Sequence, residues 1–173
     1  MDERLFHPRD FAISIIRCDM KQSQIAQMLT EIWQIWRGFL QPNYRINRDI
    51  FCREVLYWCD YLCLPEKFHN ERDAINEDLK DIDNVKSLFY DDFEPISYAK
   101  YLWIRLQFVN SSRYMSILMR TFLKNQGFKR RTSERLKYFR HCLDFYHIQT
   151  YRNGELCDLA DCELDDRITF RPT

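Results

Sequence analysis

Residues 132–157 read TSERLKYFRHCLDFYHIQTYRNGELC, and the spacing of their apolar side chains changes at His147. Before that point apolar residues recur every three or four positions, which predicts a helix over 132–147. The apolar positions of this helix are Leu136, Phe139, Leu143 and Tyr146. Thr132 or Ser133 is the expected N-cap, because a hydroxyl there can accept a hydrogen bond from the first free amides.

A β-hairpin is expected directly after this helix. Asn153-Gly154 separates two short strand-like runs within 148–157, and a type I′ turn needs positive φ at both of its central residues. Residues 168–171, Ile-Thr-Phe-Arg, are expected to form a third strand.

The chain before this stretch is predicted to be mainly helical. It holds few turn residues, since the whole sequence has only 3 glycines and 5 prolines, which argues against a many-stranded fold. The expected helices run from Pro8 to about Cys18, from Ser23 until Pro42 stops the helix, from Asn47 to about Leu62, from Pro95 to about Val109, and from Ser111 or Ser112 to Gly127. The first could instead be a short strand, because Phe11, Ile13 and Ile15 alternate. The third is apolar nearly all round, so a central position is expected.

Three parts are expected along the chain, together forming one compact unit. Residues 1–65 form an N-terminal helical part, and 66–94 form an acidic linker or loop region. Residues 95–173 hold the resumed apolar pattern and the hairpin.

Charge is distributed very unevenly, although the formal net charge is zero. Residues 1–98 carry 12 Lys and Arg against 18 Asp and Glu, and residues 155–173 carry 2 against 6. Residues 99–154 carry 12 against 2, a net charge of +10. Such asymmetry predicts an anionic partner for the central segment, either nucleic acid or an acidic protein surface.

The order of helix, basic turn, helix and hairpin in the C-terminal part resembles a winged-helix unit. The fold class is therefore expected to be mainly α, with a helical N-terminal part and a C-terminal winged-helix-like unit that carries a small β-hairpin. The helix over 132–147 would be the recognition helix, and the Asn153-Gly154 hairpin the wing. A helix fits the major groove of DNA, and arginine suits both phosphate contacts and the guanine edge.

The residues predicted to bind nucleic acid are Lys129, Arg130, Arg131, Arg135, Lys137, Arg140 and Arg152. The alternative is a solvated basic helix inside a protein complex, because acidic residues follow the wing, where phosphate would approach. These residues are Asp158, Asp161, Glu163, Asp165 and Asp166.

In its size, its aromatic-rich N-terminal half and its basic helix followed by the Asn153-Gly154 wing, the chain resembles the winged-helix accessory (middle) subunits of bacterial defence complexes built on SMC or ABC-type ATPases. That resemblance implies a non-catalytic subunit that bridges an ATPase, an effector and DNA. A transcription-factor-like DNA-binding regulator is an alternative.

An RNA-cleaving protein is the other alternative. Arg135-x5-His141 resembles the arginine–histidine motif of HEPN-type ribonucleases, but Leu136 stands where a polar residue usually follows the arginine. The sequence has no Walker loop, no Gly-x-Ser-x-Gly and no His-Glu-x-x-His. We therefore expect no enzyme activity, no cofactor and no small-molecule substrate.

Aromatic residues are abundant, with 13 Phe, 10 Tyr and 4 Trp. Large rings anchor many interfaces, so Trp33, Trp36 and Trp58 are predicted to lie on or beside a protein–protein interface. The alternative is a phenylalanine-rich core.

Seven cysteines are expected to be reduced thiols of a cytoplasmic protein, because the first residues are charged and no apolar leader or membrane span is evident. No metal site is expected. Cys59-x3-Cys63 with His69, and His141 and His147 with Cys157-x4-Cys162, lack the Cys-x2-Cys spacing of common zinc sites.

Overall fold

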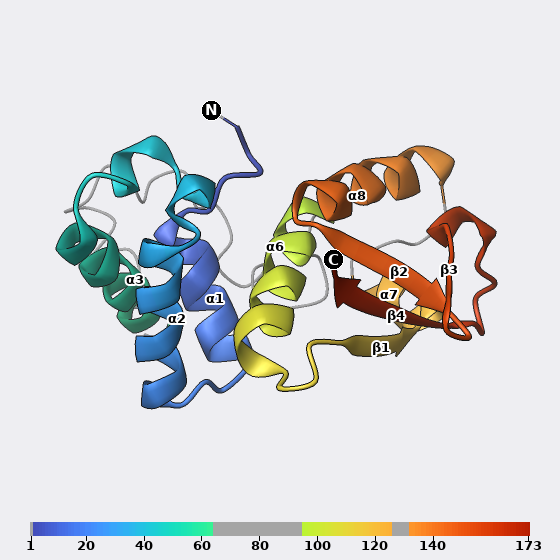
Figure 1. The fold of residues 1–173 in the computed structure, drawn as a ribbon, viewed down its shortest axis with the longest axis horizontal. Coiled ribbons are helices and arrows are strands. Elements are labelled where there is room, and N and C mark those ends of the chain that lie inside the picture. The colour runs from blue at the N-terminus through green and yellow to red at the C-terminus, as the bar shows by residue number, and fades with distance from the viewer. Residues whose placement is uncertain (1, 64–94, 126–131) are drawn as a thin grey trace.

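A computed structural model describes residues 2–63, 95–125 and 132–173. The described chain is mostly helical and carries a small antiparallel sheet (Figure 1). The predicted linker at 66–94, the helix stop at Gly127 and the basic turn at 129–131 lie outside the described residues.

The N-terminal part holds three α-helices, and two short 3₁₀ turns lie between the second and the third. They are α1 (Pro8–Arg17), α2 (Gln22–Gln34), η1 (Arg37–Phe39), η2 (Pro42–Tyr44) and α3 (Arg48–Cys63). Pro8 occupies the first turn of α1, as predicted, so the strand alternative for this segment is wrong. Asn47 also caps α3 as predicted, because its Oδ1 accepts the backbone amides of Asp49 and Ile50 at 2.8 and 3.2 Å. Ser23 is not the cap of α2; the N-cap is Lys21, two residues earlier, and the helix starts at Gln22.

The described residues of the C-terminal part combine helices with four strands. Its elements are α6 (Pro95–Ile104), the π-helical turn η5 (Arg105–Val109), β1 (Met115–Leu118), α7 (Met119–Lys124), α8 (Ser133–Phe145), β2 (Ile148–Arg152), β3 (Glu155–Leu156), η6 (Leu159–Asp161) and β4 (Arg167–Pro172). The strand order is β1-β4-β2-β3, and every neighbouring pair is antiparallel. The predicted helix over 132–147 and the predicted third strand are both confirmed, by α8 and β4.

One predicted helix is partly wrong. Residues 115–118 form strand β1, and helix α7 begins only at Met119. The apolar run of this segment fits either a helix or a strand by spacing alone. Pairing decides between them, because Met115 lies opposite Phe170 and Leu118 opposite Arg167 in β4, about fifty residues later in the chain.

The hairpin turn follows the prediction. Asn153 has φ of 54° and Gly154 φ of 88°, the positive values that a type I′ turn requires. Tyr151 pairs with Leu156, and Arg152 with Glu155, on either side of the turn.

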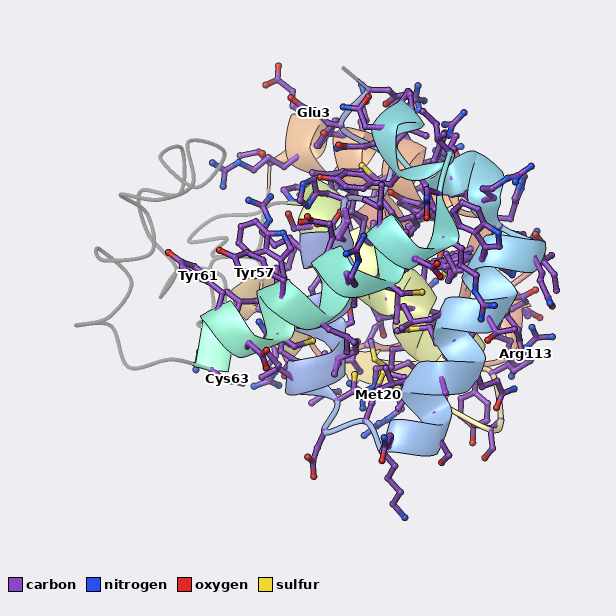
Figure 2. All side chains as sticks on the ribbon, turned by 90° about the vertical axis from the view of Figure 1, so that its left-hand side faces the viewer. Glu3, Met20, Tyr57, Tyr61, Cys63 and Arg113 are labelled. Carbon is purple, nitrogen blue, oxygen red and sulfur yellow. The ribbon has the colours of Figure 1, made fainter. Side chains whose placement is uncertain are left out.

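The centre of the molecule is α6 rather than α3, which corrects the expectation that α3 is central. Helix α6 lies between the N-terminal helices and the sheet (Figure 1), and eight of its ten residues are buried. Helix α3 packs one side on α1 and leaves Leu56 51% exposed. Figure 2 shows α3 on the near surface, with Tyr57 and Tyr61 on one side of it, stacked at 6.4 Å between ring centroids. The apolar residues around α3 therefore do not make it the most buried helix.

The hydrophobic core is continuous across the two described parts. Phe6 contacts Trp103 and Tyr146, with centroid distances of 5.2 and 5.4 Å. The Tyr146 hydroxyl donates a hydrogen bond to the carbonyl oxygen of Arg4. Lys100 of α6 forms a buried ion pair with Asp10 of α1 at 2.8 Å. The N-terminal segment is thus built into the same core as α6 and α8.

Candidate functional site

Helix α8 positions the basic side chains that the sequence singled out. Its apolar stripe, Leu136, Phe139, Cys142 and Leu143, is buried against α6 and the sheet. The predicted DNA-contacting residues Arg135, Lys137 and Arg140 are all exposed on this helix. Lys129, Arg130 and Arg131, also predicted to bind nucleic acid, lie outside the described residues.

Two of the predicted DNA-binding arginines are held by carboxylates of the same chain. Both carboxylates belong to residues 155–166, which we call the acidic loop. Arg140 forms an ion pair with Asp158, and Arg152 pairs with Asp166 at 2.9 Å. Arg152 also donates to the carbonyl oxygen of Asp161 at 3.0 Å. A phosphate that approached either arginine would also meet the negative charge of its carboxylate partner.

The Arg152 contact also shifts the pKa of Asp166. The Arg152 guanidinium, followed by the backbone N–H of Glu163, holds the pKa of the Asp166 carboxyl below its usual value. The same contact raises the pKa of Arg152. Asp165 of the acidic loop is in turn paired with Arg120 of α7. Three ion pairs therefore tie the acidic loop to the body of the C-terminal part.

A pocket of about 350 Å³ lies between α8, β2 and the acidic loop, and we call it the wing pocket. Its apolar lining consists of Leu143, Ile148, Leu156 and Leu159, and its polar lining includes Asp144 and Thr150. Three of these four apolar side chains are buried, but Leu156 is 64% exposed. The Arg140–Asp158 ion pair also lines the wing pocket. The pocket thus joins an apolar floor to charged walls.

Several cysteine thiols of the described chain have raised pKa values, and one of them lies next to another cysteine. Cys157 and Cys162 lie side by side with their Sγ atoms 3.7 Å apart. Burial, together with the Cys157 contact, raises the pKa of the Cys162 thiol to about 12. Burial similarly raises the pKa of Cys59 and Cys142 to about 11. Protonated thiols of this kind pack as small apolar groups.

The second of the weighed metal arrangements, which joins His141 and His147 to Cys157 and Cys162, does not come together in the described chain. No group of three or more His, Cys, Asp or Glu side chains converges within residues 2–63, 95–125 and 132–173. His69, a member of the first arrangement, lies outside those ranges.

The arginine and histidine of the ribonuclease-like motif do not share one face. Both side chains are exposed on α8, but a separation of six residues turns them roughly 120° apart at 3.6 residues per turn. The ribonuclease alternative stays a prediction.

The predicted interface tryptophans are packed to different degrees. Trp58 is only 4% exposed, so it offers a partner almost no surface. Trp33 and Trp36 are half-buried, and they contact the core rings of Phe51 and Trp103 at 6.3 and 5.5 Å. Much of the aromatic surplus therefore packs inside the chain. An interface at Trp33 and Trp36 stays a prediction.

One cationic surface was missed by the sequence reasoning. On the sheet, the Arg171 guanidinium lies 5.0 Å from the Tyr151 ring centroid and 5.9 Å from that of Tyr114. Beside them, the hydroxyls of Ser116 and Thr169 are hydrogen-bonded at 2.7 Å. The alternation of polar and apolar residues within 167–171 was the signal that could have found this polar sheet face.

Known proteins offer no further guide. Comparison of the chain with protein-family models, with curated proteins and with solved structures finds no significant match. In the described part of the chain, no helix has both the length and the apolar character needed to cross a membrane. Inferences about function therefore depend on the surface chemistry of the C-terminal part.

Proposed function

We propose that the chain is a non-catalytic accessory subunit of a multi-protein complex, and that its C-terminal part is a winged-helix-like module. The observation that carries this proposal is the arrangement of α7, α8 and the sheet. Two consecutive helices stand between β1 and the β2–β3 hairpin, and β4 returns between β1 and β2. A helical pair followed by a hairpin of this kind presents one exposed helix face beside a protruding wing.

The module is proposed to contact DNA through the N-terminal half of α8. Arg135 and Lys137 are exposed there, and the basic turn 129–131 directly precedes the helix in sequence. The acidic loop lies beside the C-terminal half of α8, where Asp158 contacts Arg140. Carboxylates repel phosphate, so the proposed contact is limited to the start of the helix.

The partners proposed for the complex are an ATPase of the SMC or ABC type and an effector, in the cytoplasm. This part of the proposal rests on the resemblance in layout described above, which is an argument from architecture. No described feature favours the ribonuclease alternative or the regulator alternative over it.

A salt series with fluorescently labelled duplex DNA tests the DNA contact. The full chain should bind at low salt, and the double variant Arg135→Glu/Lys137→Glu should bind weakly or not at all. Each lost phosphate contact should lower the slope of log K against log salt by about 1. The matched control is Arg37→Glu/Arg53→Glu, which reverses two exposed charges in the N-terminal part and should leave binding unchanged.

Two outcomes would contradict the proposal. One is the absence of binding by the full chain even at low salt, which would remove DNA as a partner. The other is equal loss of binding in both double variants, which would show that net charge rather than the α8 surface controls binding. Circular dichroism on every variant separates these results from unfolding.

A further inference from the structure

We infer that the wing pocket is a docking site for a short segment of a protein partner that carries an apolar side chain flanked by Lys or Arg. This inference rests on the proposed accessory role and adds to it a second site and the chemistry of its occupant. It places protein docking and DNA contact on two different parts of the same module.

The shape and lining of the wing pocket suit an apolar side chain. Its volume of about 350 Å³ exceeds that of a single leucine side chain, and its floor is formed by Leu143, Ile148 and Leu159, which are buried. Leu156 stands at the rim with 64% of its surface exposed. An incoming apolar group would cover Leu156 and remove its surface from water, which contributes favourably to binding.

A second exposed leucine lies on the same loop. Leu164 is 52% exposed, and with Leu156 it belongs to the small set of large apolar side chains that the described chain leaves in water. A single exposed leucine needs no explanation. Leu164 does not line the pocket, and its carbonyl oxygen accepts the backbone N–H of Arg120 in α7 at 2.9 Å. Leu156 differs because it lines the wing pocket, so the pocket, rather than the number of exposed leucines, marks the binding surface.

The charge around the wing pocket selects the flanking residues of the occupant. The acidic loop carries six Asp and Glu and no Lys or Arg. Three of these carboxylates, those of Asp158, Asp165 and Asp166, are neutralised by arginines of the C-terminal part. The remaining three are Glu155, Asp161 and Glu163; they are exposed, and none pairs with a cation in the described ranges.

The balance of charge favours a basic protein segment over nucleic acid. Unpaired carboxylates attract Lys and Arg and repel phosphate, so they steer one class of partner and exclude the other. Asp144, which lines the wing pocket from α8, adds a further exposed carboxylate. The occupant is therefore a basic and apolar peptide segment.

The site is already formed before any partner arrives. The Arg140–Asp158 and Arg152–Asp166 ion pairs join the loop to α8 and β2, and Cys162 of the loop is itself buried. The Asp158 carboxylate also accepts the backbone N–H of Ala160 at 2.9 Å, which closes the turn η6. A surface held in its binding conformation loses less entropy on association.

The test uses the full chain and three labelled octapeptides with blocked ends. The first is Lys-Arg-Lys-Leu-Leu-Lys-Arg-Lys, the second replaces both leucines with glycine, and the third replaces every basic residue with glutamate. Fluorescence anisotropy should show the tightest binding for the first peptide, weakened about tenfold by the glycine exchange. The glutamate peptide should not bind. Amide signals of residues 143–159 in ¹⁵N spectra should shift with the first peptide.

Two variants and one control locate the binding surface. Leu156→Ser should weaken binding of the leucine peptide about tenfold. The double variant Glu155→Lys/Glu163→Lys should also weaken its binding. The matched control is Leu56→Ser on α3, at the opposite end of the molecule from β3 (Figure 1), with a similar exposed fraction of 51%. This control should bind as the unchanged chain does.

Several results would overturn the inference. The first is no binding of the leucine peptide up to about 1 mM, a weak limit for specific recognition. The second is equal binding of the peptide by Leu156→Ser and Leu56→Ser. The third is a shift of the amide signals of residues 143–159 by duplex DNA, which would make the occupant nucleic acid. The proposed DNA contact is tested independently, by the loss of DNA binding in the Arg135→Glu/Lys137→Glu variant. A chain that binds the peptide but no DNA keeps this inference and loses only the DNA contact.

Discussion

Replacing Lys100 with methionine should strongly destabilise the protein. The Lys100 ammonium lies 2.8 Å from the Asp10 carboxylate, and the two side chains are only 10% and 8% exposed. The same carboxylate oxygen accepts the backbone N–H of His7 at 2.8 Å, within the capping box that starts α1. Methionine keeps most of the apolar stem of lysine but removes the charge, so Asp10 would remain buried with a single hydrogen bond.

The expected loss in the free energy of unfolding is about 3–5 kcal/mol, the usual cost of removing one partner of a buried ion pair. This is a large share of the roughly 5–15 kcal/mol by which a domain is stable. The remaining hydrogen bond from His7 places the loss nearer the lower limit. The pair also joins α1 to α6, so its loss should weaken the contact between the N-terminal and C-terminal parts.

Urea denaturation followed by circular dichroism at neutral pH measures this loss. Lys100→Met, Asp10→Asn and the double variant form a double-mutant cycle. The double variant should be less destabilised than the sum of the two single variants, because neither charge is then left unpaired. Asp2→Asn, which breaks the exposed Arg4–Asp2 pair, is the control and should cause no resolvable change.

A loss below about 1 kcal/mol in both single variants would refute this reasoning, because that is the range of a solvated surface pair. Additive losses in the double variant would also refute it, since they would show no coupling between the two charges.

Three smaller predictions follow from individual contacts. Tyr146→Phe should lower the free energy of unfolding by about 1 kcal/mol in urea denaturation, because the Arg4 carbonyl loses its donor; an unchanged midpoint would contradict this. Gly154→Ala should cost about 1 kcal/mol by the same assay, because φ is 88° and a Cβ there meets no neighbour that could offset the strain; a more stable variant would speak against the turn geometry. The Asp166 carboxyl should titrate below its ordinary range in ¹³C spectra, and Arg152→Ala should raise its pKa. Since the folded pKa is lowered, this contact stabilises the fold above the unfolded pKa and is lost as pH falls through the folded pKa; a titration curve unchanged by Arg152→Ala would disprove the assignment.

Local signals were enough to predict the elements on which the candidate site is built. The three- and four-residue spacing of Leu136, Phe139 and Leu143 predicts both α8 and its buried side. Asn153-Gly154 predicts the turn between β2 and β3, because few residue pairs accept two positive φ angles in succession. Such features depend on neighbours within one or two turns of the chain, so they can be read without knowledge of distant segments.

Contacts between distant segments explain what local reasoning missed. Residues 115–118 became a strand because β4, far along the chain, pairs with them. Arg152 belongs to the predicted binding set by charge, yet Asp166 holds it, and Lys100 is buried because Asp10 of α1 meets it. The spacing of apolar residues indicates whether a segment is a helix or a strand and which of its faces is buried. Which charge meets which carboxylate, and which leucine stays exposed at a pocket rim, depend on how the elements pack in three dimensions.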